Sequence, residues 1–229
     1  MLNRLVLATA VFVVMAASGG RDIEAASEMQ CQALQSQDFS TIIDASTHVM
    51  ATRAVATANE FPAYCQVKGY VSSAIEFELR LPLENWNGKF IQRGCGGFCG
   101  SIFIDACNNH VKDGYACIAS DMGHTSTAID AKWAYNDLQA EIDFGYRATH
   151  VVTVTGKVIT ESFYDNAPQR SYFMGCSTGG RQGLVEAQRF PHDFDGIVAG
   201  APVIDETGAG MELLWTVVAN RDDDGKQIL

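Results

Sequence analysis

The pattern of hydrophobic and polar positions predicts short strands along most of the chain. Residues 67–71 and 75–81 alternate apolar and polar side chains, which is typical of half-buried strands. Short apolar runs at residues 115–120, 171–175 and 196–200 indicate strands that are buried on both faces. A further strand, residues 89–92, precedes a glycine-rich loop at residues 94–100.

Segments with a helical spacing of apolar residues lie between these strands. Residues 178–189 are predicted to form a helix between the last two strands. Residues 137–164 keep a roughly helical spacing of apolar positions, although residues 151–155 (Val-Val-Thr-Val-Thr) favour a strand by propensity, and we predict a helix there. Strands that alternate with helices predict an α/β fold with a mostly parallel sheet.

Composition and charge limit the class of protein. With 229 residues, 47% of them hydrophobic and 19% charged, the chain is typical of one folded domain. The net charge of −11 repels nucleic acid and anionic lipid, so we expect neither a nucleic-acid partner nor a membrane partner.

The first residues have the three parts of a secretory signal peptide. Arg4 is followed by an apolar run at residues 5–17 and by small residues at 18–20. This run is shorter than the roughly 20 apolar residues that a membrane span needs. We therefore predict a signal peptide at residues 1–26 and a mature chain, residues 27–229, that is secreted or periplasmic.

Export changes what the seven cysteines are expected to do. An oxidising compartment favours disulfide bonds over a metal site. The spacing of Cys95, Cys99, Cys107 and Cys117 also differs from the paired CxxC motifs of zinc sites. Because seven is an odd number, one thiol is expected to lack a partner.

The motif with the clearest chemistry is Gly175-Cys176-Ser177-Thr178-Gly179, which matches the G-x-S-x-G nucleophile elbow. A strand before the motif and a helix after it provide the sharp turn that exposes a serine hydroxyl at a helix N-terminus. Ser177 is therefore the predicted nucleophile. The N–H of Thr178 is the first predicted oxyanion donor, and Gly96 or Gly97 is the best-placed second donor.

The loop Gly94–Gly100 also supports an alternative function. A glycine-rich loop after a strand, followed by a helix and by a strand ending at Asp121, is typical of dinucleotide-binding βαβ units in oxidoreductases. The spacing is not G-x-G-x-x-G, however, the loop contains two cysteines, and exported proteins rarely meet nicotinamide cofactors. We therefore favour a serine hydrolase over this alternative.

Several longer motifs together resemble the tannase and feruloyl esterase family. They are Trp-Asn-Gly-Lys-Phe at 86–90, Ser-Asp-Met-Gly-His at 120–124, Gly-Cys-Ser-Thr-Gly-Gly-Arg-Gln-Gly at 175–183, Glu-Ala-Gln-Arg-Phe-Pro at 186–191 and Phe-Asp-Gly-Ile-Val-Ala-Gly-Ala-Pro at 194–202. The resemblance implies a secreted serine esterase of the α/β-hydrolase fold. Its substrates would be phenolic acid esters such as feruloyl or galloyl esters.

The resemblance also assigns individual residues. It implies that Ser177 is the nucleophile and that Thr178 with Gly96 or Gly97 forms the oxyanion hole. Among the cysteines it implies a Cys31–Cys65 disulfide and two further pairs among Cys95, Cys99, Cys107 and Cys117. Cys176 stays unpaired, because its family partner lies beside the catalytic histidine. The family's calcium lies in a lid between the serine and its acid, so we expect no cofactor in this chain.

A catalytic acid and histidine are expected to follow the serine in this fold. The one histidine after Ser177 is His192, and a helix of 12 residues would place it about 18 Å or more away. Asp193 and Asp195 have the same problem. His124 is expected to order a loop by hydrogen bonding. We therefore expect an N-terminal fragment of a catalytic domain that is inactive by itself, with a non-catalytic remnant as the further alternative.

Overall fold

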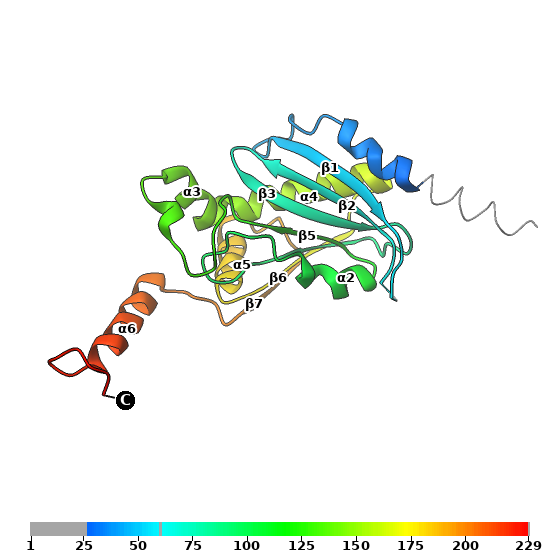
Figure 1. The fold of residues 1–229 in the computed structure, drawn as a ribbon. Helices are drawn as coiled ribbons and strands as arrows, with labels where there is room; N and C mark the ends of the chain where they lie inside the picture. Colours follow the sequence, from blue (N-terminus) through cyan, green and yellow to red (C-terminus); the bar gives the residue numbers. More distant parts are fainter. Residues whose placement is uncertain (1–26, 60, 229) are drawn as a thin grey trace, which may run out of the picture.

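A computed structural model describes residues 27–59 and 61–228, so the predicted signal peptide lies outside the described residues. The centre of the fold is a seven-stranded sheet in the order β1-β2-β3-β5-β4-β6-β7 (Figure 1). The strands are β1 (Thr47–Val55), β2 (Tyr64–Val71), β3 (Ile75–Pro82), β4 (Lys89–Arg93), β5 (Ala116–Ser120), β6 (Arg170–Cys176) and β7 (Gly196–Gly200).

Helices connect the later strands, and the predicted α/β class is confirmed. Residues 27–33 are helical, and the further α-helices are α2 (Asn108–Lys112), α3 (Leu138–Ile142), α4 (Ala148–Tyr164), α5 (Thr178–Arg189) and α6 (Glu206–Ala219). Short 3-10 turns lie at Leu34–Ser36, Ile104–Cys107 and Lys132–Ala134, and a π-helical turn at Asp143–Arg147 joins α3 to α4.

The sheet has an antiparallel half and a parallel half. Strands β1, β2, β3 and β5 pair antiparallel in that order, whereas β5, β4, β6 and β7 pair parallel. The carboxyl ends of these four parallel strands therefore meet at one edge of the sheet, which we call the carboxyl edge. Loops at this edge are where open α/β sheets bind their ligands.

The two faces of the sheet are covered by different helices. Phe90 and Ile118 point to the face on which α4 packs, and their neighbours Ile91 and Cys117 point to the face of α2. Helix α5 packs on β6 and β7 on the same face as α4, next to the buried Phe173 (Figure 1). The helix that begins at the end of β6 is thus fixed by the core.

The ambiguous stretch at residues 137–164 is helical, as predicted. It consists of α3, the π-helical turn and α4, in that order. Val151, Val152 and Thr155 are almost completely buried against the sheet. Burial of a helix face thus outweighs the strand propensity of these β-branched residues.

Besides the helix at residues 27–33, two elements were not predicted from the sequence. Strand β1 is an edge strand with a register shift between Val49 and Ala51, and it lacks a regular alternation of buried and exposed residues. Helix α6 has no buried residue, and Figure 1 shows it projecting away from the sheet. Neither element has the periodic burial on which a prediction from sequence depends.

Three disulfide bonds hold the described part of the chain together. Cys31 is bonded to Cys65, Cys95 to Cys99 and Cys107 to Cys117, whereas Cys176 is free and exposed. The second bond closes the glycine-rich loop after β4.

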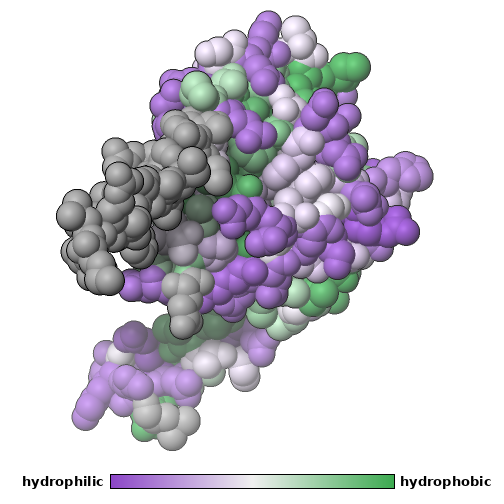
Figure 2. All heavy atoms as spheres, turned by 90° about the vertical axis from the view of Figure 1, so that its right-hand side faces the viewer, coloured by the Kyte–Doolittle hydropathy of each residue, from purple (hydrophilic) through white to green (hydrophobic). Residues whose placement is uncertain are grey.

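Hydrophilic residues cover much of the face in Figure 2, with smaller hydrophobic patches between them. Within the described residues, no helix has the length and apolar character needed to cross a membrane.

Candidate active site

Ser177 occupies the sharp turn between β6 and α5. Its backbone has φ 59° and ψ −119°, in a region that non-glycine residues rarely adopt, and the residue is exposed. The Ser177 N–H donates to the carbonyl of Gly200 (3.0 Å), and the Ser177 carbonyl accepts from the N–H of Arg181 (3.0 Å). These bonds to β7 and α5 hold the strained turn in place.

Glycines allow the strand and the helix to approach closely around this serine. A Cβ atom on Gly175 would lie 2.5 Å from the backbone C and O of Gly179. A Cβ atom on Gly180 would lie 2.3 Å from the carbonyl oxygen of Gly200. Both distances are shorter than real contacts, so larger residues would force β6, α5 and β7 apart.

The glycine-rich loop after β4 lies against the start of α5. The Thr178 hydroxyl donates to the carbonyl of Gly97 (2.7 Å), and the Cys95 N–H donates to Oε1 of Gln182 (3.2 Å). Gly97 has φ +58°, and a Cβ there would lie 2.2 Å from the Ala128 carbonyl oxygen. The fold thus brings Gly97, and the loop that contains Gly96, to Thr178, as an oxyanion hole made by this loop would require.

His124 orders this loop. Its Nε2 lies 2.7 Å from the carbonyl oxygen of Phe98, and its ring stacks on Trp133 with centroids 3.7 Å apart. Burial lowers the pKa of His124, which favours a neutral ring whose Nε2–H donates to Phe98. The imidazole is therefore engaged with the loop rather than with Ser177.

Asp193 and Asp195, two acidic residues that follow the serine in the chain, lie at the opposite edge of the sheet. Asp195 is bonded to Ser171 at the start of β6. The Asp195 N–H donates to the Ser171 carbonyl (2.7 Å), and the Ser171 N–H donates to Oδ2 of Asp195 (2.8 Å). Ser171 lies six residues before Ser177, or about 20 Å along a strand. Asp193 binds His150 on α4. Across residues 27–59 and 61–228, no imidazole is hydrogen-bonded to the Ser177 hydroxyl.

Arg181 anchors the elbow helix to the π-helical turn. Its guanidinium donates to the carbonyls of Gly145 (3.1 Å) and Phe144 (3.3 Å), and it lies over the Phe144 ring, 4.7 Å from the centroid. The wider turn leaves carbonyl groups available to accept these bonds. The sequence contained no signal for this contact, because it depends on a local break in helical spacing.

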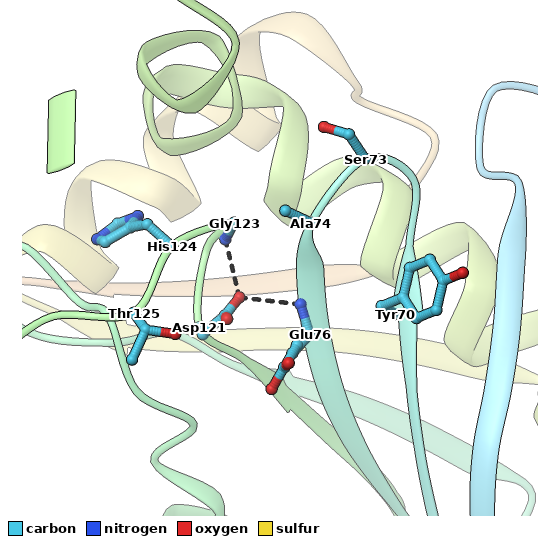
Figure 3. Close-up of a pocket in the computed structure, with 8 residues that line it drawn as sticks. All are labelled: Tyr70, Ser73, Ala74, Glu76, Asp121, Gly123, His124 and Thr125. Atoms are coloured by element: carbon cyan, nitrogen blue, oxygen red, sulfur yellow. Dashed lines mark hydrogen bonds between the residues drawn. The ribbon is translucent and has the colours of Figure 1, made fainter. Parts of the chain in front are cut away.

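A hollow of about 360 Å³ opens beside His124, between the start of β3 and the segment after β5. Its lining residues are Tyr70, Ser73, Ala74, Glu76, Asp121, Gly123, His124 and Thr125 (Figure 3). Oδ1 of Asp121 accepts from the backbone N–H groups of Glu76 (3.0 Å) and Gly123 (2.8 Å). Asp121 thus joins the two segments at the carboxyl edge, a role that the sequence did not reveal.

Substitution of Asp121 by Asn is expected to remove a pH dependence of stability. Burial raises the pKa of Asp121 to about 7, above its value of 3.8 in an unfolded chain. Between these two pH values the Asp121 carboxyl is protonated in the folded state and ionised in the unfolded state. Its contribution to the free energy of unfolding is therefore present at acid pH and is lost as the pH rises through 7. Asn keeps the acceptor oxygen but does not ionise. The free energy of unfolding of Asp121→Asn, relative to the wild type, should therefore increase by about 2 kcal/mol from pH 5 to pH 8.

Urea unfolding of both proteins at the two pH values measures this difference. Asp105→Asn, a carboxyl that lies outside the hollow, serves as the control and should show no comparable gain. An Asp121→Asn difference that stays constant from pH 5 to pH 8 would contradict the prediction.

An exposed serine in a strained strand–helix turn, next to a glycine loop at the carboxyl edge of a parallel sheet, is the arrangement of the α/β-hydrolase class. Within this class, the family model described as tannase and feruloyl esterase matches residues 57–229. The chain belongs to the tannase and feruloyl esterase family.

Individual relatives agree with this assignment. The chain is 35% identical over 222 residues to the mono(2-hydroxyethyl) terephthalate hydrolase of Piscinibacter sakaiensis, with 83% of this chain and 36% of the relative covered. It is 40% identical over 145 residues to feruloyl esterase B of Aspergillus niger, with 61% of this chain and 27% of the relative covered.

Among solved structures, the crystal structure of feruloyl esterase B from Aspergillus oryzae superposes with a TM-score of 0.76 at 28% identity. The match covers 86% of this chain and 42% of that one, and it confirms the α/β-hydrolase fold. The chain spans roughly a third of the length of the curated relatives described above. Membership of this family supports the hydrolase prediction over the dinucleotide-binding alternative.

Proposed function

We propose that this chain carries the nucleophile half of a carboxylic ester hydrolase site, with Ser177 as the residue that is acylated. The observation that carries the proposal is the exposed, strained Ser177 between β6 and α5, with the loop of Gly96 and Gly97 bonded to Thr178. The acyl group would come from an aromatic acid ester of the feruloyl or galloyl type. The names of the family and of both relatives refer to hydrolysis of esters of aromatic acids.

The chemical steps follow from this arrangement. The Ser177 oxygen attacks the ester carbonyl carbon and loses its proton to a base, while the carbonyl oxygen becomes an oxyanion. The N–H groups of Thr178 and of Gly96 or Gly97 would stabilise that oxyanion. Collapse breaks the bond to the alcohol, which leaves with a proton, and water then releases the aromatic acid from the serine.

We place the base in these steps outside residues 27–59 and 61–228, since no imidazole within these ranges is hydrogen-bonded to the Ser177 hydroxyl. No step involves calcium, which the family resemblance places in a lid. The three disulfide bonds support a secreted or periplasmic location.

An activated ester tests the nucleophile. p-Nitrophenyl ferulate has a good leaving group, so Ser177 should be acylated slowly without a base, and the acyl-enzyme should persist because its hydrolysis needs the same base. Mass spectrometry of proteolytic peptides is expected to find one feruloyl group per chain, attached to Ser177. Labelling by p-nitrophenyl ferulate is expected to exceed labelling by p-nitrophenyl butyrate.

Two neighbouring substitutions make the result specific. Ser177→Ala should lose the label, whereas Cys176→Ser, which removes the exposed thiol beside it, should keep the label. A label that disappears in Cys176→Ser and persists in Ser177→Ala would refute the proposed role of Ser177.

A further inference from the structure

A second group of chemically active side chains lies away from the serine, where α4, α5 and the loop before β7 meet. His150 comes from α4, Glu186 from the third turn of α5 and Asp193 from the loop. One potential ligand atom from each of the three lies within 4.8 Å of the others. Glu186 is eight residues beyond the start of α5, or about 12 Å along the helix, so the cluster is separate from the proposed ester site.

Glu186 is the unusual member of this group. Its side chain is completely buried, and neither of its carboxylate oxygens has a hydrogen-bond partner among the described residues. A buried carboxylate without a partner is costly, so the position favours a compensating positive charge.

The neighbouring cation, Lys157, interacts electrostatically with Glu186 but does not form an ion pair with it. Lys157 donates to the backbone carbonyl of Asp193, and it forms no ion pair with either carboxylate in the described part of the chain. His150 Nδ1 lies 2.6 Å from Oδ2 of Asp193, and Phe190 stacks on the imidazole with centroids 3.8 Å apart. The ring is thus held with one nitrogen facing the two carboxyl groups.

We propose that His150, Glu186 and Asp193 form a structural site for Zn²⁺. One imidazole and two carboxylates are ligands that zinc accepts, and the two carboxylates would balance its charge. Ligand atoms bound at about 2.0–2.2 Å with tetrahedral angles lie about 3.4 Å apart. The 2.6 Å contact between His150 and Asp193 would therefore lengthen, and any separation near the 4.8 Å limit of the cluster would shorten. The side chains of His150 and Asp193 are 22% and 13% exposed, which leaves an entry path and room for a water ligand.

The ion would join three segments that are far apart in the sequence. It would connect α4 to the third turn of α5 and to the loop that leads into β7. Ca²⁺ is a poorer fit, because it prefers six to eight oxygen ligands and no imidazole.

Metal binding to the full chain tests the proposal. The background variant is Cys176→Ser, which removes the free thiol that could itself bind zinc. After dialysis against EDTA, titration with ZnCl₂ in a calorimeter is expected to show saturable binding of one ion per chain and a rise in melting temperature. CoCl₂ should give the visible absorption bands of a low-symmetry site with a nitrogen ligand.

Glu186→Gln keeps the shape of the side chain and should weaken zinc binding at least about 10-fold. His192→Asn, a histidine in the same loop but outside the cluster, is the matched control and should bind as the background does. If Glu186→Gln does not fold, the zinc titration of the Cys176→Ser background protein alone tests the proposal. Absence of saturable zinc binding, or binding that is lost in His192→Asn and kept in Glu186→Gln, would overturn the proposal.

Discussion

Turnover of methyl ferulate by this chain alone is expected to be about 10⁶-fold slower than turnover by a serine esterase whose nucleophile contacts a histidine. The reason is geometric. Ser177 is exposed and well placed, but no described imidazole bonds to its hydroxyl, and His124 is engaged with the Phe98 carbonyl. An unassisted serine hydroxyl is a weak nucleophile near neutral pH. Initial rates measured by chromatography, with feruloyl esterase B as the comparison enzyme, give the ratio.

Two further measurements separate a missing base from a misfolded site. Because members of a catalytic unit act together, Ser177→Ala should change the small residual rate by less than about 2-fold. Free imidazole at high concentration should raise the rate of the wild type more than that of Ser177→Ala, because it can reach the exposed hydroxyl. Ordinary enzyme rates that are lost in Ser177→Ala would show that the chain supplies its own base and would contradict this prediction.

Replacement of Gly175 by Ala is expected to cost about 3 kcal/mol of folding free energy, at the upper end of the usual range for overpacking. The added methyl would lie 2.5 Å from the backbone C and O of Gly179, and backbone atoms cannot move aside as a flexible side chain can. Either β6 and α5 separate or the strained turn at Ser177 changes. Urea unfolding followed by circular dichroism measures the loss, and labelling of Ser177 by p-nitrophenyl ferulate should fall with it.

Gly210→Ala is the matched control for this substitution. Gly210 lies in α6, and a Cβ there would meet no atom within 4 Å. Alanine is a better helix former than glycine, so this variant should be as stable as the wild type or slightly more stable. A loss of less than about 1 kcal/mol in Gly175→Ala would show that the elbow tolerates a side chain at this position.

The helix at 178–189 and the strand at 196–200 were predicted with the bounds that the structure has, although their burial differs from the expectation. The predicted burial of the strand on both faces was wrong, because β7 is an edge strand without a buried residue. Helix α5 buries polar residues and glycines, including Gln182 and Glu186, and leaves Leu184 exposed. Ser177 at the turn was also predicted from the sequence, because the residues that form the turn are its neighbours in the chain. Edge strand β1 and helix α6 were missed because their burial follows no period.

What the sequence alone determined is therefore local. It includes the α/β class, the turn that exposes Ser177 and the family that its motifs resemble. Only the tertiary structure decided which distant groups meet, because such contacts depend on strand order and helix packing rather than on spacing in the chain. It placed the Gly97 carbonyl next to the Thr178 hydroxyl, Asp121 between the start of β3 and the segment after β5, and His150 beside Asp193 and Glu186.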